Sequence, residues 1–409
     1  METKVKMGLA ITRPFLFSTA LVLSLTGCED AAQNRVPTPE WTLERELTIG
    51  SLDGPNDALT RIGSISLGNN GEVLITQPRE RVIRVFDRHG NFRREFAGEG
   101  DGPGEFRSMG LIKRLADTLY LTDFQNQRTS FFSEEGVFLY SFQFSSPDLG
   151  EGLWLPNPTW LLEDGTALGI TAYFFNAAAN GTVTGIPIVR ITRSGEVIDT
   201  VVTYPLHTRP FAWDEGQVSF GSESPFSDNP EVEYVPARAE LMILDAPAPR
   251  SGGPAAYVIN WLSLDGDTVD IWEVPYVPSP IPRSIRDSVI DTAVEDVTKG
   301  PNPLIRSRRV ARTGFEDAWD LPEYYPPVTG VEVAEDGRVW VRREDLPGPS
   351  VWWDLLSPEG AVAARLQLPA GLAIQESTGS TVWGTERDEL GVNYLVRFRI
   401  LNHDHQVGG

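Results

Sequence analysis

A repeated segment constrains the fold of this chain more than any other feature. Residues 73–96 (VLITQPRERVIRVFDRHGNFRREF) align without a gap with residues 119–142 (LYLTDFQNQRTSFFSEEGVFLYSF), at an offset of 46. A turn glycine with apolar residues four before and six after it occurs at five positions: Gly90, Gly136, Gly195, Gly266 and Gly360. This pattern is typical of a β-hairpin that buries one face. Because a single hairpin cannot bury that face alone, the copies must stack on one another.

A period in the forties, with about four strands in each unit, predicts a β-propeller. Middle strands follow Asn-Gly or Asp-Gly turns, and the five hairpins account for five blades. A sixth pair of strands lies at 380–400, and the N-terminal segment 41–59 supplies the outer strand that this pair lacks. The expected fold is therefore all-β: a six-bladed propeller over residues 41–401, closed by the N-terminal strand, with seven blades as the alternative.

One repeat resembles a known propeller unit, the NHL repeat. Asp123, Asn126 and Arg128 stand at the three polar positions of its D-x-x-N-x-R pattern, and the link 98–106 (GEGDGPGEF) is similar to that family's glycine-proline-glycine connection between blades. In the first repeat the same three positions hold other residues: Gln77, Glu80 and Val82. The whole chain is similar to six-bladed propeller lipoproteins of bacteria, most of which have no assigned activity. The resemblance implies a structural role for the three motif residues and for the five turn glycines.

The N-terminus has the features of an export signal. A basic region precedes the apolar run 14–25, which is too short to span a bilayer comfortably, and LTGC ends at Cys28, the only cysteine. LTGC resembles the bacterial lipoprotein box, which implies a signal peptide over 1–27 and a lipid on Cys28. Residues 28–40 then form a flexible tether, and the protein is exported and held at a membrane of the cell envelope. A buried thiol behind an ordinary secretory signal is the alternative.

The composition excludes some partners. The formal net charge of −22 repels nucleic acid and anionic lipid. With a single cysteine, the folded part must be stabilised by its core rather than by disulfides. We expect a monomer.

Uneven spacing of the later turn glycines indicates insertions. Residues 283–299 are predicted to be a helix between blades four and five, with Ile285, Val289, Ala293 and Val297 on its apolar face and Ser284 and Asp287 in a capping box. The helix is either a lid or partner-binding element, or it packs its apolar face on the sheet, and packing is favoured. Two proline- and glycine-rich segments, 220–235 and 245–255, are expected to be loops that line a binding face.

No catalytic, cofactor or metal site is predicted. His89 precedes a turn glycine, His207 lies in a loop without a recognisable partner, and His403 and His405 lie in a tail (402–409) that we expect to be disordered. The acidic segment 263–270 is expected to be a hairpin turn rather than a calcium loop. The tryptophans are expected to pack between strands rather than to stack a ligand: Trp154, Trp160, Trp213, Trp352, Trp353 and Trp383.

The sequence thus favours a binding or scaffolding module over an enzyme. Its ligand is expected to be a protein, a peptide or a glycan. The alternative is a metal-dependent hydrolase or lactonase with its site in the central tunnel, where acidic side chains at the ends of inner strands would hold the metal.

Overall fold

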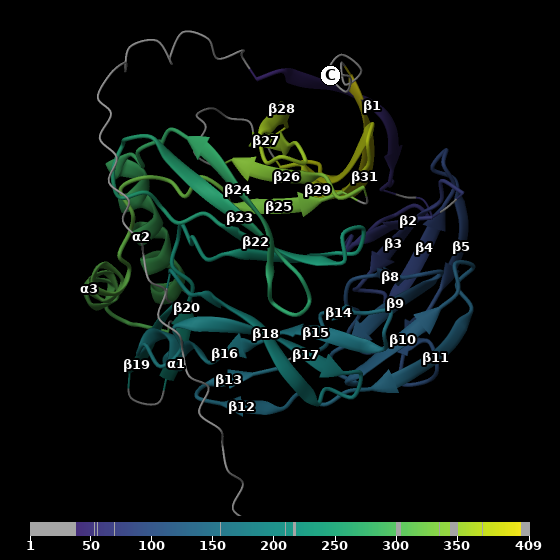
Figure 1. Cartoon of the computed structure of the whole chain (residues 1–409), viewed down its shortest axis with the longest axis horizontal. Helices are drawn as coiled ribbons and strands as arrows, with labels where there is room; N and C mark the ends of the chain where they lie inside the picture. Colours follow the sequence, from purple (N-terminus) through teal and green to yellow (C-terminus); the bar gives the residue numbers. More distant parts are fainter. Residues whose placement is uncertain are drawn as a thin grey trace, which may run out of the picture. The chain divides into compact units, whose positions relative to one another are not determined.

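The computed structural model describes residues 38–401, except 53, 55, 69, 156, 209, 216–217, 300–303, 335, 344–350 and 370. Within 211–222 the backbone is described but the side chains are not. The predicted signal peptide, Cys28 with its predicted lipid, and most of the predicted tether lie outside the described residues, as do His403, His405 and the rest of the tail. The structure is all-β with few helices (Figure 1).

Most strands belong to six antiparallel arrangements of four, which we number as sheets 1 to 6 in chain order. Sheets 1 to 3 consist of these strands: β2 (Ile65–Leu67), β3 (Val73–Gln77), β4 (Val82–Phe86) and β5 (Phe92–Phe96); β8 (Lys113–Leu115), β9 (Thr118–Asp123), β10 (Arg128–Phe132) and β11 (Phe138–Gln143); β14 (Trp160–Leu161), β15 (Thr166–Ile170), β17 (Gly185–Thr192) and β18 (Val197–Pro205).

Sheets 4 to 6 consist of these strands: β21 (Glu231–Val235), β22 (Glu240–Asp245), β23 (Ala255–Leu262) and β24 (Thr268–Tyr276); β25 (Gly330–Val333), β26 (Val339–Arg343), β27 (Val351–Leu356) and β28 (Val362–Leu368); β29 (Ala373–Ser377), β30 (Thr381–Arg387), β31 (Asn393–Leu401) and β1 (Glu40–Ile49). Sheets 5 and 6 are joined into one sheet of eight strands, because β1 also pairs in parallel with β28.

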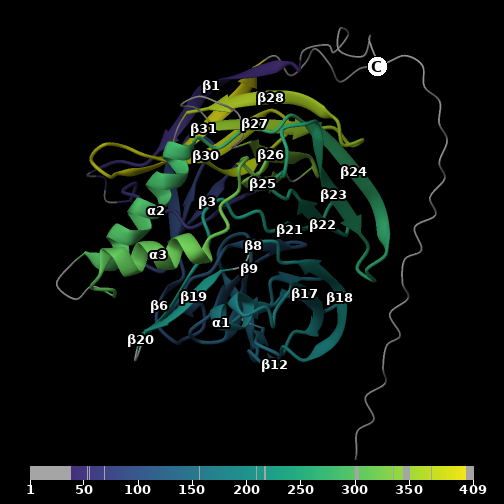
Figure 2. The ribbon, with the colours of Figure 1, turned by 90° about the vertical axis from the view of Figure 1, so that its left-hand side faces the viewer.

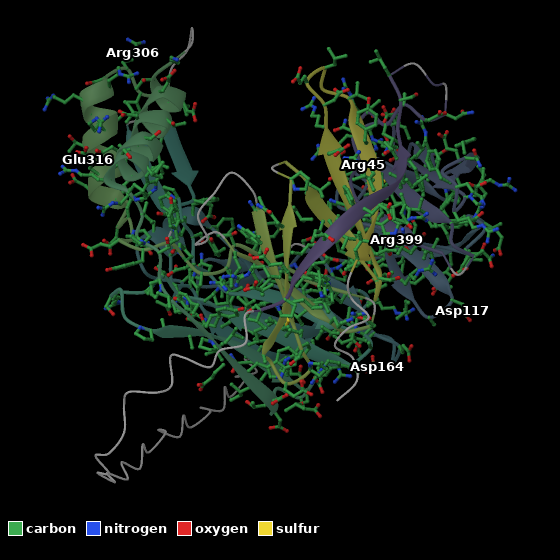
Figure 3. All side chains as sticks on the ribbon, turned by 90° about the horizontal axis from the view of Figure 1, so that it is seen from above. Arg45, Asp117, Asp164, Arg306, Glu316 and Arg399 are labelled. Carbon is green, nitrogen blue, oxygen red and sulfur yellow. The ribbon has the colours of Figure 1, made fainter. Side chains whose placement is uncertain are left out.

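The N-terminal strand β1 completes sheet 6, as its sequence indicates. It pairs antiparallel with β31 from Thr42↔Leu401 to Ile49↔Leu395. Ion pairs reinforce the pairing: the two terminal nitrogens of Arg45 lie 2.5 and 2.7 Å from the carboxylate oxygens of Glu386, and Arg399 pairs with Glu44. Figure 3 shows Arg45 and Arg399 along these two strands. Segments about 350 residues apart in the sequence therefore share one sheet.

Six hydrophobic clusters lie between successive sheets. Five of them join each sheet to the next, from sheets 1 and 2 to sheets 5 and 6. In the sixth cluster, Ile49 and Trp383 of sheet 6 pack with Val73 and Phe86 of sheet 1. Each sheet therefore buries both faces, which explains why strands such as β3 are buried at every position. The clusters form a closed cycle.

The direction of the strands assigns each loop to one of two faces. The four strands of each sheet alternate in direction. The loops that join strand one to strand two and strand three to strand four therefore lie at one end of the sheet, which we call the turn face. Loops that join strands two to three, and each sheet to the next, lie at the other end, the insertion face. The five turn glycines lie at the turn face, with φ between 79° and 91°.

All additional elements lie in loops of the insertion face. They are β6 (Gly98–Glu99), β7 (Glu105–Phe106), β12 (Asp148–Gly150), β13 (Leu153–Trp154), β16 (Ala172–Tyr173), α1 (Phe175–Ala179), β19 (Phe211–Glu215), β20 (Val218–Ser222), α2 (Arg283–Thr298) and α3 (Arg308–Ala318). In Figure 2, α2, α3, β19 and β20 lie on the opposite side from the hairpin tip of β23 and β24.

The helical insertion differs from the sequence expectation in three ways. The helix α2 begins after Pro282 without a side-chain cap, so the predicted capping box of Ser284 and Asp287 is wrong. Its buried residues are Ile290, Val294 and Val297, whereas Ile285 is 41% exposed. These side chains pack on a second helix, α3, through Phe315 and Trp319, so the expected packing on the sheet is also wrong.

The segment 220–235 was expected to be a loop throughout, which is also wrong. Its last five residues form β21, the first strand of sheet 4. Gly221, Pro225 and Pro230 precede this strand and favour a loop, so the short strand was missed.

Candidate functional site

The NHL-like residues lie at the insertion face and hold the link between sheets 1 and 2. The buried carboxylate of Asp123 accepts hydrogen bonds from the backbone N–H groups of Arg107 (2.8 Å) and Ser108 (3.1 Å) and from the Asn126 side chain (2.9 Å). The Arg128 guanidinium donates to three carbonyl oxygens of the link: Asp101 (2.9 Å), Gly102 (3.1 Å) and Glu105 (2.6 Å). All of these bonds lie within the chain, so the constellation shapes a connection.

A central cavity of about 420 Å³ lies where the first strands of all six sheets meet. Its walls come from β2, β8, β14, β21, β25 and β29, and neighbouring first strands contact one another. Five charged residues on four different sheets line the cavity: Lys113 and Arg114 of β8, Glu233, Glu332 and Glu376. Alternation along short strands places Lys113 and the three glutamates inward while their neighbours enter the clusters between sheets.

The cavity changes the acidity of these groups. Burial lowers the pKa of Lys113 to about 8, although the nearby Glu233 opposes the shift. Burial, together with the charges of Glu376 and Glu233, raises the pKa of Glu332 to about 9. The Lys113 ammonium donates to the carbonyl oxygen of Thr159 (2.9 Å) and lies 4.9 Å from the centre of the Trp160 ring. The cavity therefore holds an amine and a carboxylic acid whose pKa values are both shifted toward each other, to about 8 and about 9. Shifts of this kind are typical of functional sites.

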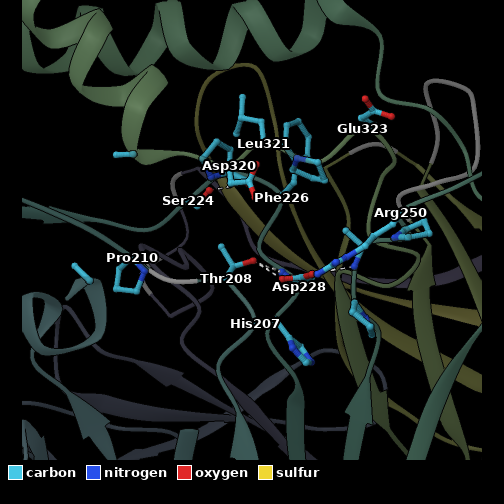
Figure 4. A pocket seen from close by; sticks show the side chains of 17 residues that line it. His207, Thr208, Pro210, Ser224, Phe226, Asp228, Arg250, Asp320, Leu321 and Glu323 are labelled. Atoms are coloured by element: carbon cyan, nitrogen blue, oxygen red, sulfur yellow. Dashed lines mark hydrogen bonds between the residues drawn. The ribbon is translucent and has the colours of Figure 1, made fainter. Parts of the chain in front are cut away.

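A larger loop pocket, of about 900 Å³, lies at the insertion face (Figure 4). Three insertions line it: the segment after β18, the loop between β22 and β23, and the segment after α3. The sequence expectation that 220–235 and 245–255 contribute to a binding face agrees with the position of Phe226, Asp228 and Arg250 in its wall. Apolar lining is provided by prolines and by Leu321.

A smaller adjoining pocket, of about 490 Å³, connects the loop pocket to the first strands of sheets 4 and 5. Phe226 and Asp228 line both pockets. The adjoining pocket also reaches Glu231 of β21 and Val328 and Thr329 before β25, whereas the central cavity begins farther along the same two strands. The three hollows therefore follow one another from the inserted loops to the centre of the sheets.

His207 has a partner that the sequence does not reveal. Its Nε2 lies 2.7 Å from Oδ1 of Asp245, at the end of β22, and both side chains are about one-third exposed. The packing of sheet 3 against sheet 4 brings the two residues together across 38 positions, so no local motif marks them. His89 lies at an exposed turn, where its Nε2 accepts a hydrogen bond from Arg88 Nε (3.1 Å).

The structure also shows where several of the tryptophans and the acidic segment 263–270 lie. Three tryptophans are buried between sheets: Trp160, Trp353 and Trp383. The segment 263–270 forms a hairpin turn, in which the Ser263 N–H donates to the carbonyl oxygen of Asp267 (2.8 Å). Within the described residues no group of three or more His, Cys, Asp or Glu side chains is placed to hold a metal ion. No helix in the described part of the chain is long and apolar enough to cross a membrane.

Comparisons with known proteins identify similar structures but no family. No protein-family model matches the chain, and no curated protein matches it either. A member of the DUF4221 family from Bacteroides vulgatus aligns with 10% identity and a TM-score of 0.48, covering 89% of this chain and 98% of its own. A Bacteroides fragilis protein described as exported aligns with 12% identity and a TM-score of 0.46, covering 88% and 95%.

A third similar structure is an inactive virginiamycin B lyase from Staphylococcus aureus, with 13% identity and a TM-score of 0.38, covering 88% of this chain and 99% of its own. The neighbours are propeller-like proteins. At these identities and TM-scores the likeness concerns the course of the chain and carries no function to this protein.

Proposed function

We propose that this protein is a six-bladed β-propeller lipoprotein of the bacterial cell envelope and that it acts as a binding module. Six arrangements of four strands, six clusters between them and closure by β1 support the blade count. In this arrangement α2 and α3 form an insertion between blades four and five. The basic and apolar N-terminus and the LTGC sequence ending at Cys28 support export and lipid attachment.

The observation that carries the binding function is the difference between the two faces. The turn face consists of tight glycine turns, whereas the insertion face carries every helix and every additional strand in the described residues. The loop pocket, the adjoining pocket and the central cavity follow one another from that face. Concave sites on a rigid scaffold are where proteins place their ligand contacts. The ligand is a protein, a peptide or a glycan of the envelope.

A blocking substitution tests this function. Ala248 lies in the wall of the loop pocket, and a tryptophan at this position should fill part of it. Purified residues 38–409 are titrated with peptides and with oligosaccharides, and the tightest binder is measured against Ala248→Trp. Affinity should fall at least about tenfold. Ala363→Trp, on the exposed side of β28, is the matched control and should bind as the parent does. Equal affinity of the parent and Ala248→Trp would contradict the proposal.

A hydrolase acting in the central cavity is the second candidate. The lowered pKa of Lys113 and the raised pKa of Glu332 favour it, because such groups exchange protons near neutral pH. Hydrolysis of lactone and ester substrates is measured with and without added divalent metal. Turnover that is lost in Lys113→Met would support this candidate, whereas binding without turnover would support the binding module.

Lipid attachment is tested separately. Wild-type protein is expected in the membrane fraction of the producing cell, and Cys28→Ser is expected in the soluble fraction. A Cys28→Ser variant that remains in the membrane fraction would contradict the lipoprotein assignment.

A further inference from the structure

We infer that the loop pocket binds an extended polypeptide segment that carries basic side chains. The inference rests on the proposed binding function and names its ligand class. Its basis is the rigidity, the length and the charge of the pocket.

Hydrogen bonds between the inserted loops give the pocket a fixed shape. The carboxylate of Asp228 accepts from the Thr208 hydroxyl and from the Ala248 N–H (2.9 Å), so it joins two insertions (Figure 4). Asn229 bonds the backbone of Thr208 twice: its Oδ1 accepts from the N–H and its Nδ2 donates to the carbonyl oxygen, each at 2.9 Å. A pocket formed before binding avoids the entropy cost of ordering loops around the ligand.

The segment after α3 is held by a short two-stranded stem. The Ile281 N–H donates to the carbonyl oxygen of Glu323 (2.8 Å), and the Tyr325 N–H donates to that of Ser279 (3.0 Å). This stem fixes the position of Asp320 and Leu321, which line the pocket on the side nearest the helices (Figure 4). The acidic side chains of this segment are therefore presented by an anchored backbone.

The hollow is longer than a single small ligand requires. The loop pocket alone is near the upper end of the range of about 300–1,000 Å³ for small-molecule sites. It continues into the adjoining pocket of about 490 Å³ past Phe226 and Asp228. Proline rings, Phe226 and Leu321 supply apolar contacts along the way. An extended chain with alternating apolar and polar side chains fits a hollow of this kind.

The charge of the pocket selects a basic segment. Asp320 and Glu323 are exposed, and neither forms an ion pair in the described part of the chain. Together with Asp228 they outnumber the one permanent cation in the lining, Arg250. The net charge of −22 adds a long-range attraction for cations. Lysine or arginine side chains therefore complement the rim, whereas acidic side chains are repelled.

Calorimetric titration with three probes tests the inference. The first is a short peptide in which three lysines alternate with leucine and proline, the second replaces its lysines by glutamates, and the third is a chitosan oligomer, a basic glycan. The lysine peptide should bind at least about tenfold more tightly than the glutamate peptide, and its affinity should fall as salt rises from about 50 to 300 mM. Asp320→Asn/Glu323→Gln should weaken it about fivefold or more.

The matched control removes the same two charges from the turn face. Asp117→Asn/Glu359→Gln changes exposed residues in turns of β8–β9 and β27–β28, and should alter the affinity less than about twofold. Thermal melting of both double variants confirms that they fold. Equal binding of the two peptides, or equal affinities of the two double variants, would overturn the inference. Chitosan binding that Ala248→Trp blocks would also overturn the inference of a polypeptide ligand, but it would leave the proposed binding function intact. If none of the three probes binds, and none of the peptides and oligosaccharides of the first test binds, both the inference and the proposed function are wrong.

Discussion

Two carboxylates illustrate how this fold uses charge at the scale of single residues. Asp123 is fully buried and is surrounded by N–H donors from the link between sheets 1 and 2. Glu332 lies in the central cavity, where burial and neighbouring carboxylates raise its pKa. The first carboxylate is an acceptor that holds a connection of the backbone, whereas the surroundings of the second stabilise the protonated acid.

Replacing Asp123 by alanine should destabilise the protein strongly. The substitution leaves the N–H groups of Arg107 and Ser108 without their acceptor in a buried place, at a cost of about 3 kcal/mol. Urea unfolding followed by tryptophan fluorescence measures the change. Asp87→Ala is the control, because Asp87 accepts the same kind of backbone bonds at an exposed turn, and it should cost less than about 1 kcal/mol. Equal losses would show that burial is not the deciding factor.

Replacing Glu332 by glutamine should stabilise the protein in a pH-dependent way. Because the folded-state pKa of about 9 exceeds the ordinary value of 4.5, the stability contributed by Glu332 is full below pH 4.5 and is lost as pH rises toward 9. Glutamine removes this loss. The gain in the free energy of unfolding over the parent should therefore be small near pH 4.5 and should grow toward pH 9, where it reaches a few kcal/mol at about 1.4 kcal/mol per pKa unit; urea unfolding at several pH values measures it. A gain independent of pH would contradict this account.

At the scale of elements, the turn glycines connect each sheet to the one before it. A Cβ added to Gly136 would lie 2.5 Å from the ring of Phe96, on the outer strand of sheet 1, and one added to Gly360 would lie 2.5 Å from Trp272, on the outer strand of sheet 4. A Cβ added to Gly266 would likewise lie 2.3 Å from the carbonyl oxygen of Val201. The recurring apolar residue six positions after a turn glycine therefore has a structural reason: it contacts the turn glycine of the next hairpin.

Gly360→Ala should cost more than Gly165→Ala. Both glycines have positive φ, 79° at Gly360 and 88° at Gly165, so alanine meets backbone strain of about 1 kcal/mol at either position. Only at Gly360 does the added methyl also collide with Trp272, which adds about 1–3 kcal/mol, whereas nothing lies within 4 Å at Gly165. Thermal unfolding of the two variants gives the difference, and similar Tm values would refute the contact.

The same scale shows what the sequence can and cannot predict. The hairpins and middle strands follow from local alternation and glycine turns, and they appear where that pattern places them, as at β3 and β26. The helix α3 was not predicted, although Ser307 caps its start and its buried residues, Ala311 and Phe315, are spaced four apart as on one face of a helix. The central cavity could not be predicted either: Lys113, Glu233 and Glu332 sit on strands of three to five residues, too short to show which side faces inward. The pair of His207 and Asp245 depends on the packing of sheet 3 against sheet 4.

At the scale of the whole molecule, closure depends on β1. A protein that begins at Thr38 keeps the whole of β1 and is the reference. Deleting residues 1–49 should lower Tm by more than about 10 °C or prevent folding, since it exposes the edge of β31 and uncovers the cluster of Ile49 and Trp383. Calorimetry of the two truncated proteins makes the comparison. Similar Tm values would show that β1 only decorates the sheet.

The direction of β1 has a mechanical consequence. The strand begins beside Leu401 at the turn face and runs toward the insertion face, where the loop pocket lies. Tension between a ligand held in that pocket and the chain before Thr38 would therefore act along β1 rather than across it. Such a load shears all the hydrogen bonds from Thr42 to Ile49 together instead of peeling them off one at a time. The strand β1 is thus oriented to resist pulling, which the proposed anchored binding module would require.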